Sequence, residues 1–278
     1  MASDLHTHTN FSDGSFSPEE LVAEAKKVGL KYLSVTDHDT VEGVKFLYEN
    51  GLYPDKGINF IPGIEFSANH TTCDVHILGY NVDIYDGALS EMINEITEAR
   101  WERLSEIIKN LQNKNYDIRE ADVLKVAGGS ASVGRFHIAR ALVKKGAFKT
   151  VREAFDKMLG NGKPAYAPRY FPEVDDIIET IHQAGGTAGL AHPLLVGDDE
   201  LVEKICAKVD FLEVFYPAHK PQDVQRYKIM AAKYNLKFSG GSDFHGSASR
   251  FVDGLGEFTV SDDIAKNFYT EDVNNATK

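Results

Sequence analysis

Asp4-Leu-His-Thr-His-Thr-Asn-Phe-Ser-Asp13-Gly14 is the most informative stretch of the sequence. It predicts a short strand, and because strand side chains repeat every second residue, His6 and His8 would point to the same side. One cation could then take both imidazoles. Asp13 follows in a Ser-Asp-Gly turn and could add a carboxylate from the end of the strand. The stretch therefore predicts the beginning of a metal site.

The composition is that of a globular protein. A chain of 278 residues is long enough for one large domain or for one domain with an insertion. No apolar run approaches the length of a membrane span, and the N-terminal residues lack the apolar core of a signal peptide. Cys73 and Cys206 are isolated, which argues against a thiolate metal site or a disulfide framework. We expect a cytoplasmic protein with no membrane association and no obligate protein partner.

Charge is unevenly distributed along the chain, whose formal net charge is −12. From Thr97 to Tyr170, 15 Lys and Arg stand against 8 Asp and Glu, whereas the remainder has 15 basic and 34 acidic residues. A basic segment in an acidic protein favours an anionic partner for that segment. The alternative is a basic helical surface that binds no ligand.

Strand and helix patterns alternate along most of the chain, as is typical of βα units. Strand-like runs are predicted at 32–36, 59–67, 74–80, 187–191, 211–215 and 237–241. Between 86 and 162 helical periodicity dominates, with Gly-rich breaks and no convincing strand. The sequence thus predicts an α/β body of residues 1–85 and 163–278, with a small helical domain, 86–162, inserted into it.

Residues of the metal-ligand type recur at the ends of the predicted strands. In a (β/α) barrel the loops after the strands gather at one face. A lone histidine there is more often an ordinary hydrogen-bonded residue, as expected for His70 and His182, and Asp39 is expected to cap the next helix. Recurrence is what favours a metal site, and nine donors imply two or three divalent cations. The nine candidates are His6, His8, Asp13, His38, Glu65, His76, His192, Asp243 and His245.

These motifs resemble those of the polymerase and histidinol phosphatase (PHP) family of metal-dependent phosphoesterases. The resemblance spans essentially the whole chain and rests on Asp4–His8 with Ser12–Gly14, Thr36–Thr40, Gly63–Ser67, His76–Tyr80, Ala191–Pro193 and Gly241–Gly246. It implies a distorted seven-stranded (β/α) barrel, the (β/α)7 PHP barrel, with a trinuclear site. The implied ligand sets are His6, His8, Glu65 and Asp243 for one ion, Glu65, His76 and His192 for a second, and Asp13, His38 and His245 for a third. A shared Glu65 is chemically sensible, since a carboxylate has two oxygens to divide between cations.

The resemblance extends to the helical insertion, which is similar to the cap of stand-alone family members. Those members act on nucleoside 3′,5′-bisphosphates, AMP-like nucleotides or short oligonucleotides. Arginine's planar fork suits a phosphate, and the start of a helix also favours anions. The alternative is that the arginines only pair with neighbouring glutamates. The substrate-binding candidates are Arg100, Arg103, Arg135, His137 and Lys163, whereas Arg140 is expected in a surface pair.

The expected activity is metal-dependent hydrolysis of a phosphate ester of a small nucleotide, such as a nucleoside 3′,5′-bisphosphate. Clustered Mn, Fe or Zn ions would lower the pKa of a bound water towards ~7 and so supply hydroxide. Asp37 and His219 are the candidates for protonating the leaving oxygen, unless a metal stabilises the alkoxide directly.

Four other interpretations stay open. A 5′-3′ exonuclease acting on short RNA is chemically adjacent. A histidinol-phosphate phosphatase would use the same metals, although the basic insertion favours a nucleotide. A catalytically silent metal-binding module is disfavoured by the complete ligand set, and an amidohydrolase acting on C–N bonds would leave the arginines unexplained. The metal, the exact substrate and the oligomeric state are left open by the sequence.

Overall fold

The structure, a computed structural model, describes residues 2–53, 57–70, 73–128 and 133–270. The chain divides into two compact units, Met1–Ile93 with Phe171–Lys278 (the barrel unit) and Asn94–Tyr170 (the helical unit). The boundaries expected from the sequence, 86 and 162, lie eight residues earlier at each end. At the first boundary the reason is that helix α3 (Gly87–Gln112) starts in the barrel unit and continues into the helical unit, so the sequence pattern becomes helical before the helical unit begins.

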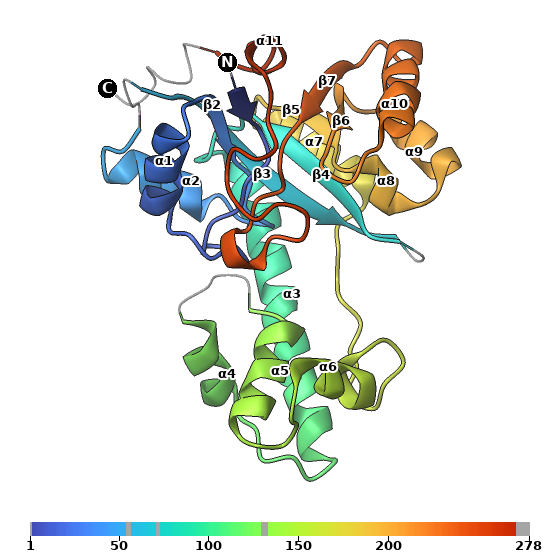
Figure 1. Ribbon diagram of the computed structural model, residues 1–278. Helices are drawn as coiled ribbons and strands as arrows, with labels where there is room; N and C mark the ends of the chain where they lie inside the picture. Colours follow the sequence, from blue (N-terminus) through green and yellow to red (C-terminus); the bar gives the residue numbers. More distant parts are fainter. Residues whose placement is uncertain (1, 54–56, 71–72, 129–132, 271–278) are drawn as a thin grey trace. The chain divides into compact units, whose positions relative to one another are not determined.

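An eight-stranded sheet forms the centre of the barrel unit, in the order β7-β6-β5-β4-β3-β2-β1-β8 (Figure 1). Neighbouring strands are parallel, except that β4 is antiparallel to both its neighbours and β8 is antiparallel to β1. The predicted α/β class with a barrel-shaped sheet is confirmed, with one strand more than the seven expected. The strands are β1 (Ala2–Asp4), β2 (Leu30–Val35), β3 (Asn59–Ala68), β4 (Val75–Tyr80), β5 (Thr187–Leu190), β6 (Phe211–Phe215), β7 (Lys237–Gly240) and β8 (Val260–Ser261).

The segments that follow β1 and β7 pair with each other, although the two strands lie far apart in the order of the sheet. The N–H of His8 donates to the carbonyl of Phe244 at 2.9 Å, and the N–H of Asp243 donates to the carbonyl of His6 at 2.9 Å. Gly241 permits this approach, because a Cβ there would lie 2.4 Å from His6 N. His6 and His8 were expected within a strand, but β1 ends at Asp4 and the two histidines lie on its extended continuation.

The reversed strand β4 results from a short connection. Only residues 69–74 separate β3 from β4, too few for the crossover that a parallel pair requires. The reversal places His76, near the beginning of β4, opposite Ser67 near the end of β3. His76 therefore reaches the same edge of the sheet as the residues that follow the parallel strands.

The helices of the barrel unit follow the predicted alternation. Helix α1 begins with the expected capping box, in which the Ser17 hydroxyl accepts the Glu20 N–H at 3.3 Å and the Glu20 carboxylate accepts the Ser17 N–H at 2.8 Å. Helices α1 and α2 lie together beside the sheet, and α8, α9 and α10 form another group (Figure 1). The helices are α1 (Pro18–Lys27), α2 (Glu42–Glu49), α7 (Val174–Gln183), α8 (Pro193–Val196), α9 (Asp199–Cys206), α10 (Pro221–Lys233) and α11 (Asp262–Ala265).

The helical unit has a hydrophobic core of its own. Buried residues of α3, such as Leu104 and Leu111, pack in one cluster with Ile138 and Leu142 of α5. Its other helices are α4 (Glu120–Ala127), α5 (Arg135–Lys144) and α6 (Val151–Ala154), which continues as a π-helical turn, Phe155–Leu159. Within the parts of the chain that the structure describes, no helix is long and apolar enough to cross a membrane.

Cys206 is predicted to be an unreactive thiol. It is 1% exposed, and burial raises its pKa to about 12. Because the thiolate is the reactive form, its thiolate fraction at pH 8 is lower than that of an ordinary thiol by on the order of a thousandfold. We expect a thiol-specific disulfide reagent to label Cys73 quickly and Cys206 slowly, and the rate at Cys206 to rise with pH or with denaturant. Equal rates at both thiols in the native protein would contradict the buried position.

Candidate metal centre

Glu65 lies at the centre of a histidine cluster in the barrel unit. Its side chain, on β3, is fully buried, and its two oxygens face different imidazoles. Oε1 lies 3.0 Å from His76 Nδ1 and 3.0 Å from His192 Nε2. Oε2 lies 3.2 Å from the Nε2 atoms of His6 and His8 and 3.1 Å from His38 Nδ1. One carboxylate thus approaches five rings.

The candidate donor atoms form overlapping groups, in each of which they lie within 4.8 Å of one another. The groups are His6, His8, Glu65 and Asp243; His8, Asp13, His38 and His245; and His38, Glu65 and His76. His192 joins the cluster through His76, since His192 Nε2 lies 3.3 Å from His76 Nδ1. The structure therefore brings all nine candidates together. Relative to the sets implied by the family resemblance, His8 and His38 each reach a second group.

The donor set fits divalent cations. Among the described residues, several of its buried atoms have no hydrogen-bond partner: His6 Nε2, both ring nitrogens of His8, His38 Nδ1 and Glu65 Oε2. Buried polar atoms nearly always have a hydrogen-bond partner. Several buried atoms that lack one and converge on one region therefore indicate ligands for an ion. Mixed imidazole and carboxylate donors suit Mn, Fe or Zn.

The electrostatics of the cluster also favour positive charge. Burial opposes charge on His8, but the neighbouring carboxylates of Asp243 and Glu65 raise its pKa to about 10. Burial likewise opposes ionisation of Glu65, yet the neighbouring His38 and His6 hold its pKa well below the usual value. For His38 burial prevails and lowers the pKa to about 4. A pocket that keeps Glu65 ionised and raises the pKa of a buried imidazole such as that of His8 is one that attracts cations.

Two of the candidates have strained backbones. His192, directly after β5, has φ of 25°, and Asp243, after β7, has φ of 54°. Residues with a Cβ rarely adopt positive φ, and such strain gathers at functional sites. The unusual backbone directs these two side chains into the cluster.

Comparison with known proteins identifies the fold family. Residues 4–183 match the family model of the PHP domain. The chain belongs to the PHP family. A 5′-3′ exoribonuclease Rnm from Salmonella typhimurium is 34% identical over 251 residues, which cover 87% of this chain and 84% of the relative. A 3′,5′-nucleoside bisphosphate phosphatase from Chromobacterium violaceum is 31% identical over 250 residues, which cover 87% and 86%.

A solved structure described as a metal-dependent phosphoesterase from Bifidobacterium adolescentis has the same fold. Its TM-score to this chain is 0.80 at 31% identity, with 95% of this chain and 94% of that chain covered. This PHP protein is therefore an enzyme of the metal-dependent phosphoesterase class, as the sequence predicted.

Asp37 anchors the loop that carries Asp13 in the PHP site. Its Oδ1 accepts the Thr9 N–H at 2.7 Å and the Ser12 hydroxyl at 2.6 Å, and its Oδ2 accepts the Thr9 hydroxyl at 2.6 Å. The side chain is 1% exposed, and burial raises its pKa. Both oxygens are occupied by the loop, so the structure gives Asp37 a supporting position, and its role as a proton donor stays a prediction.

Asp39 does not cap helix α2, contrary to the expectation. Its carboxylate accepts the Ser67 N–H at 2.8 Å, whereas the N-cap of α2 is Val41, which has no side-chain cap. The backbone of Asp39 pairs with β3 instead, since the N–H of Asp39 donates to the carbonyl of Glu65 at 2.9 Å. Asp39 thus joins the two strand ends that deliver His38 and Glu65.

His219, the other candidate proton donor, follows β6. Its Nδ1–H donates to the Val214 carbonyl at 2.9 Å, which leaves a lone pair on Nε2. Nε2 is buried without a partner among the described residues, and burial lowers the pKa of the ring. This environment favours the neutral imidazole. A role in protonating the leaving group stays a prediction.

Glu213 and Tyr216, which are outside the predicted set, contact candidate ligands through their side chains. Glu213, on β6, accepts hydrogen bonds from His6 and His192, and the Tyr216 hydroxyl donates to Asp243 Oδ2 at 2.9 Å. The signal for Glu213 is a lone carboxylate within the apolar run Phe211–Phe215. A carboxylate in a buried strand needs a partner, and here the partners are the histidines of the PHP site.

Three arginine candidates of the helical unit, Arg100, Arg103 and Arg135, form a cluster in the sense that the charges of the other two act on Arg103. The Arg103 Nε–H donates to the Ala167 carbonyl at 2.9 Å. Burial, together with the positive charges of Arg135 and Arg100, lowers the pKa of Arg103 to about 10. A bound anion would reduce the electrostatic repulsion between positive charges that lie together in a partly buried place. The cluster is therefore suited to a phosphate.

Arg135 is held by polar and aromatic contacts. Its Nη1 donates to the Leu159 carbonyl at 3.2 Å and to Asn161 Oδ1 at 3.1 Å, and its guanidinium lies 5.5 Å from the centre of the Tyr166 ring. Neither Arg103 nor Arg135 forms an ion pair with a carboxylate of the described residues, so the structure does not support the alternative that they only pair with glutamates.

The remaining candidates of the helical unit differ in their surroundings. His137 Nδ1 accepts the Gly134 N–H at 3.2 Å, so this nitrogen helps to cap its own helix. Lys163 is exposed. Arg140, expected in a surface ion pair, instead has its guanidinium 5.9 Å from the centre of the Phe136 ring.

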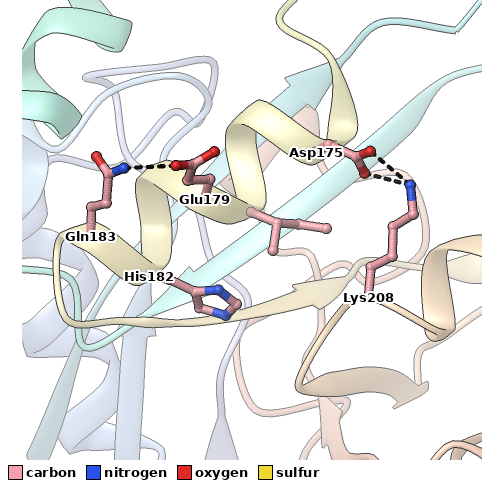
Figure 2. A pocket seen from close by; sticks show the side chains of 6 residues that line it. Asp175, Glu179, His182, Gln183 and Lys208 are labelled. Carbon is pink, nitrogen blue, oxygen red and sulfur yellow. Dashed lines mark hydrogen bonds and ion pairs between the residues drawn. The ribbon is translucent and has the colours of Figure 1, made fainter.

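A separate hollow of the barrel unit lies between α7 and the end of α9 (Figure 2). Its polar side chains contact one another: Lys208 Nζ lies 2.6 and 2.8 Å from the Asp175 oxygens, and the Gln183 amide donates to Glu179 at 3.0 Å. None of the nine candidate ligands lines it. The hollow is therefore distinct from the PHP metal centre.

Proposed function

We propose that the barrel unit hydrolyses a phosphate ester of a small nucleotide, such as a nucleoside 3′,5′-bisphosphate, at a centre of two or three Mn, Fe or Zn ions. The convergence of the nine candidate residues, with Glu65 at their centre, carries the proposal. When bound, such ions polarise phosphoryl oxygens and lower the pKa of water. The ligands would be the nine candidates, with Glu65 offering one oxygen to each of two sets of imidazoles.

The arginines of the helical unit would bind a phosphate of a nucleotide substrate. Arg103 and Arg135 present planar forks that match paired phosphate oxygens, and neither is neutralised by a carboxylate of the described residues. The name of the Chromobacterium relative describes a phosphatase for this class of nucleotide. Arg100, His137 and Lys163 complete the proposed set of substrate contacts.

Arg135→Ala tests this assignment. We expect kcat/KM for adenosine 3′,5′-bisphosphate to fall by about 10–100-fold, mainly through KM, because one charge-assisted phosphate contact is worth about 1.5–3 kcal/mol. Hydrolysis of an aryl phosphate, which has no second phosphate, should change by less than about threefold. His76→Ala should depress both activities.

Arg152→Ala is the matched control, since the Arg152 side chain, in the same unit, is 91% exposed and lies 3.9 Å from Asp156. It should behave like the wild type on both substrates. Equal losses from Arg135→Ala on the bisphosphate and on the aryl phosphate would contradict its proposed role. Histidinol phosphate is included as a third substrate in the same assay. Its hydrolysis would distinguish a histidinol-phosphate phosphatase from a nucleotide phosphatase.

A 5′-3′ exonuclease acting on short RNA is the second candidate, and exposed aromatic side chains favour it. Phe136 is 54% exposed and Trp101 is 38% exposed, and Arg140 stands beside the Phe136 ring. Aromatic rings next to cations bind nucleobases with little regard to sequence. The name of the Salmonella relative describes such an activity. Stepwise release of mononucleotides from 5′-phosphorylated oligomers would support this candidate, and absence of oligomer turnover would exclude it.

A further inference from the structure

Glu213 links two of the candidate ligands through one buried carboxylate. The side chain, on β6, is fully buried. Its Oε1 lies 3.0 Å from His6 Nδ1, and its Oε2 accepts the His192 backbone N–H at 2.6 Å. His6 faces Oε2 of Glu65, whereas His192 faces Oε1. Glu213 therefore contacts histidines that stand on the two sides of the central carboxylate.

We infer that Glu213 is a positioning residue that orients His6 and His192 for divalent cations; this inference rests on the proposed metal centre. An ionised carboxylate can only accept, so the Nδ1 of His6 must be the donor. The lone pair of His6 is then on Nε2, the atom that lies 3.2 Å from Glu65 Oε2 and 3.5 Å from Asp243 Oδ1. A carboxylate behind a ligating histidine fixes its tautomer and its orientation.

At His192 the contact acts through the backbone. His192 has φ of 25°, a conformation that is costly for a residue with a Cβ. The hydrogen bond from its N–H to Glu213 holds this peptide in place, and His192 Nε2 then lies 3.0 Å from Glu65 Oε1. Relaxation of the strained peptide would turn the ring away. The carboxylate of Glu213 thus supports an otherwise unfavourable geometry.

A purely structural role does not account for a carboxylate at this position. The flanking Leu212 and Val214 are fully buried and apolar. Moving a carboxylate out of water costs several kcal/mol, and an apolar residue in such a strand is often at least as stabilising. The contacts of the Glu213 carboxylate with His6 and His192 therefore explain why a charged residue stands at this position.

Glu213→Gln is the direct test, because the amide keeps the shape but offers one accepting oxygen to two donors. We expect the affinity of Glu213→Gln for Mn²⁺, measured by equilibrium dialysis with Mn²⁺ alone, to fall by about 10–100-fold. Losses of this size are typical when the hydrogen-bond partner of a metal-ligating histidine is substituted. Glu213→Ala should lower the Mn²⁺ affinity further. Raising the Mn²⁺ concentration should restore hydrolysis by Glu213→Gln.

Asp210→Asn is the matched control. Asp210 Oδ2 lies 2.7 Å from His182 Nε2 and accepts the Ala188 N–H at 2.8 Å, so it makes the same kinds of contact as Glu213 (His182 is shown in Figure 2). Neither partner is a candidate ligand. Asp210→Asn should keep the wild-type Mn²⁺ affinity even if both substitutions lower the stability of the fold.

A second measurement needs no variant. In the Zn²⁺-loaded wild-type protein, long-range proton–nitrogen spectra should show His6 with its proton on Nδ1, protected from exchange. A His6 protonated on Nε2 would overturn the inference, as would wild-type Mn²⁺ affinity in Glu213→Gln. Absence of Mn²⁺ binding by the wild type would instead overturn the proposed metal centre itself, and this role with it.

Discussion

Glu65→Gln should abolish nearly all hydrolysis, with kcat/KM falling by about 10³-fold or more. The Glu65 carboxylate lies within 3.2 Å of five imidazole nitrogens, more than any other described side chain of the cluster. An amide keeps one accepting oxygen and replaces the other by a donor, which faces imidazole nitrogens that are needed as ligands. Cations in such sites contribute several kcal/mol to transition-state stabilisation, and each 1.36 kcal/mol is a factor of ten.

The measurement combines steady-state kinetics with the metal content of the purified protein. Glu65→Gln should bind fewer equivalents of divalent ion than the wild type, and added Mn²⁺ should not restore its activity. Glu203→Gln is a suitable control, because Glu203 pairs with Lys233 at 2.7 Å on the outer helices. A Glu65→Gln protein with full metal content and activity within about tenfold of the wild type would refute the central place of this carboxylate.

The ligand positions were predictable because they depend on local patterns. A residue that follows an apolar strand is delivered to the edge of the sheet, and this holds for His38, His192 and Asp243 without knowledge of the pairing. His6 and His8 need only the alternation of extended backbone to point to one side. The α/β class and the candidate cluster therefore follow from short stretches of sequence.

The groups that support the ligands were not predictable in the same way, because their partners are distant in the chain. Glu213 contacts His6 across 207 residues, and Asp4 receives the Ser242 N–H across 238. Asp39 shows the limit directly: next to a helix start it resembles a cap, but the pairing of β2 with β3 offers it Ser67 instead. Such choices depend on strand pairing, which local propensity does not encode.

Asp37→Ala should destabilise the fold by about 3–5 kcal/mol, because it leaves the Thr9 N–H and two hydroxyls without their buried acceptor. The loop from Thr9 to Gly14 would lose its anchor, and Asp13 would lose its fixed position next to His245, whose Nε2 lies 3.1 Å away. Thermal or denaturant unfolding with and without Mn²⁺ measures the loss. A decrease in free energy of unfolding below about 1 kcal/mol would contradict the anchoring role.

Asp37→Asn separates the anchor from a proton donor. The amide keeps an accepting oxygen for the Thr9 N–H, and the hydroxyls of Thr9 and Ser12 can reorient, so we expect a cost of about 1–2 kcal/mol and a modest loss of kcat. An amide cannot transfer a proton to the leaving oxygen. If Asp37 were the acid, Asp37→Asn would lose about 10²–10⁴-fold in kcat while its stability and Mn²⁺ content stayed close to those of the wild type. Because both carboxylate oxygens face the loop at 2.6–2.7 Å, we expect stability to respond more than catalysis.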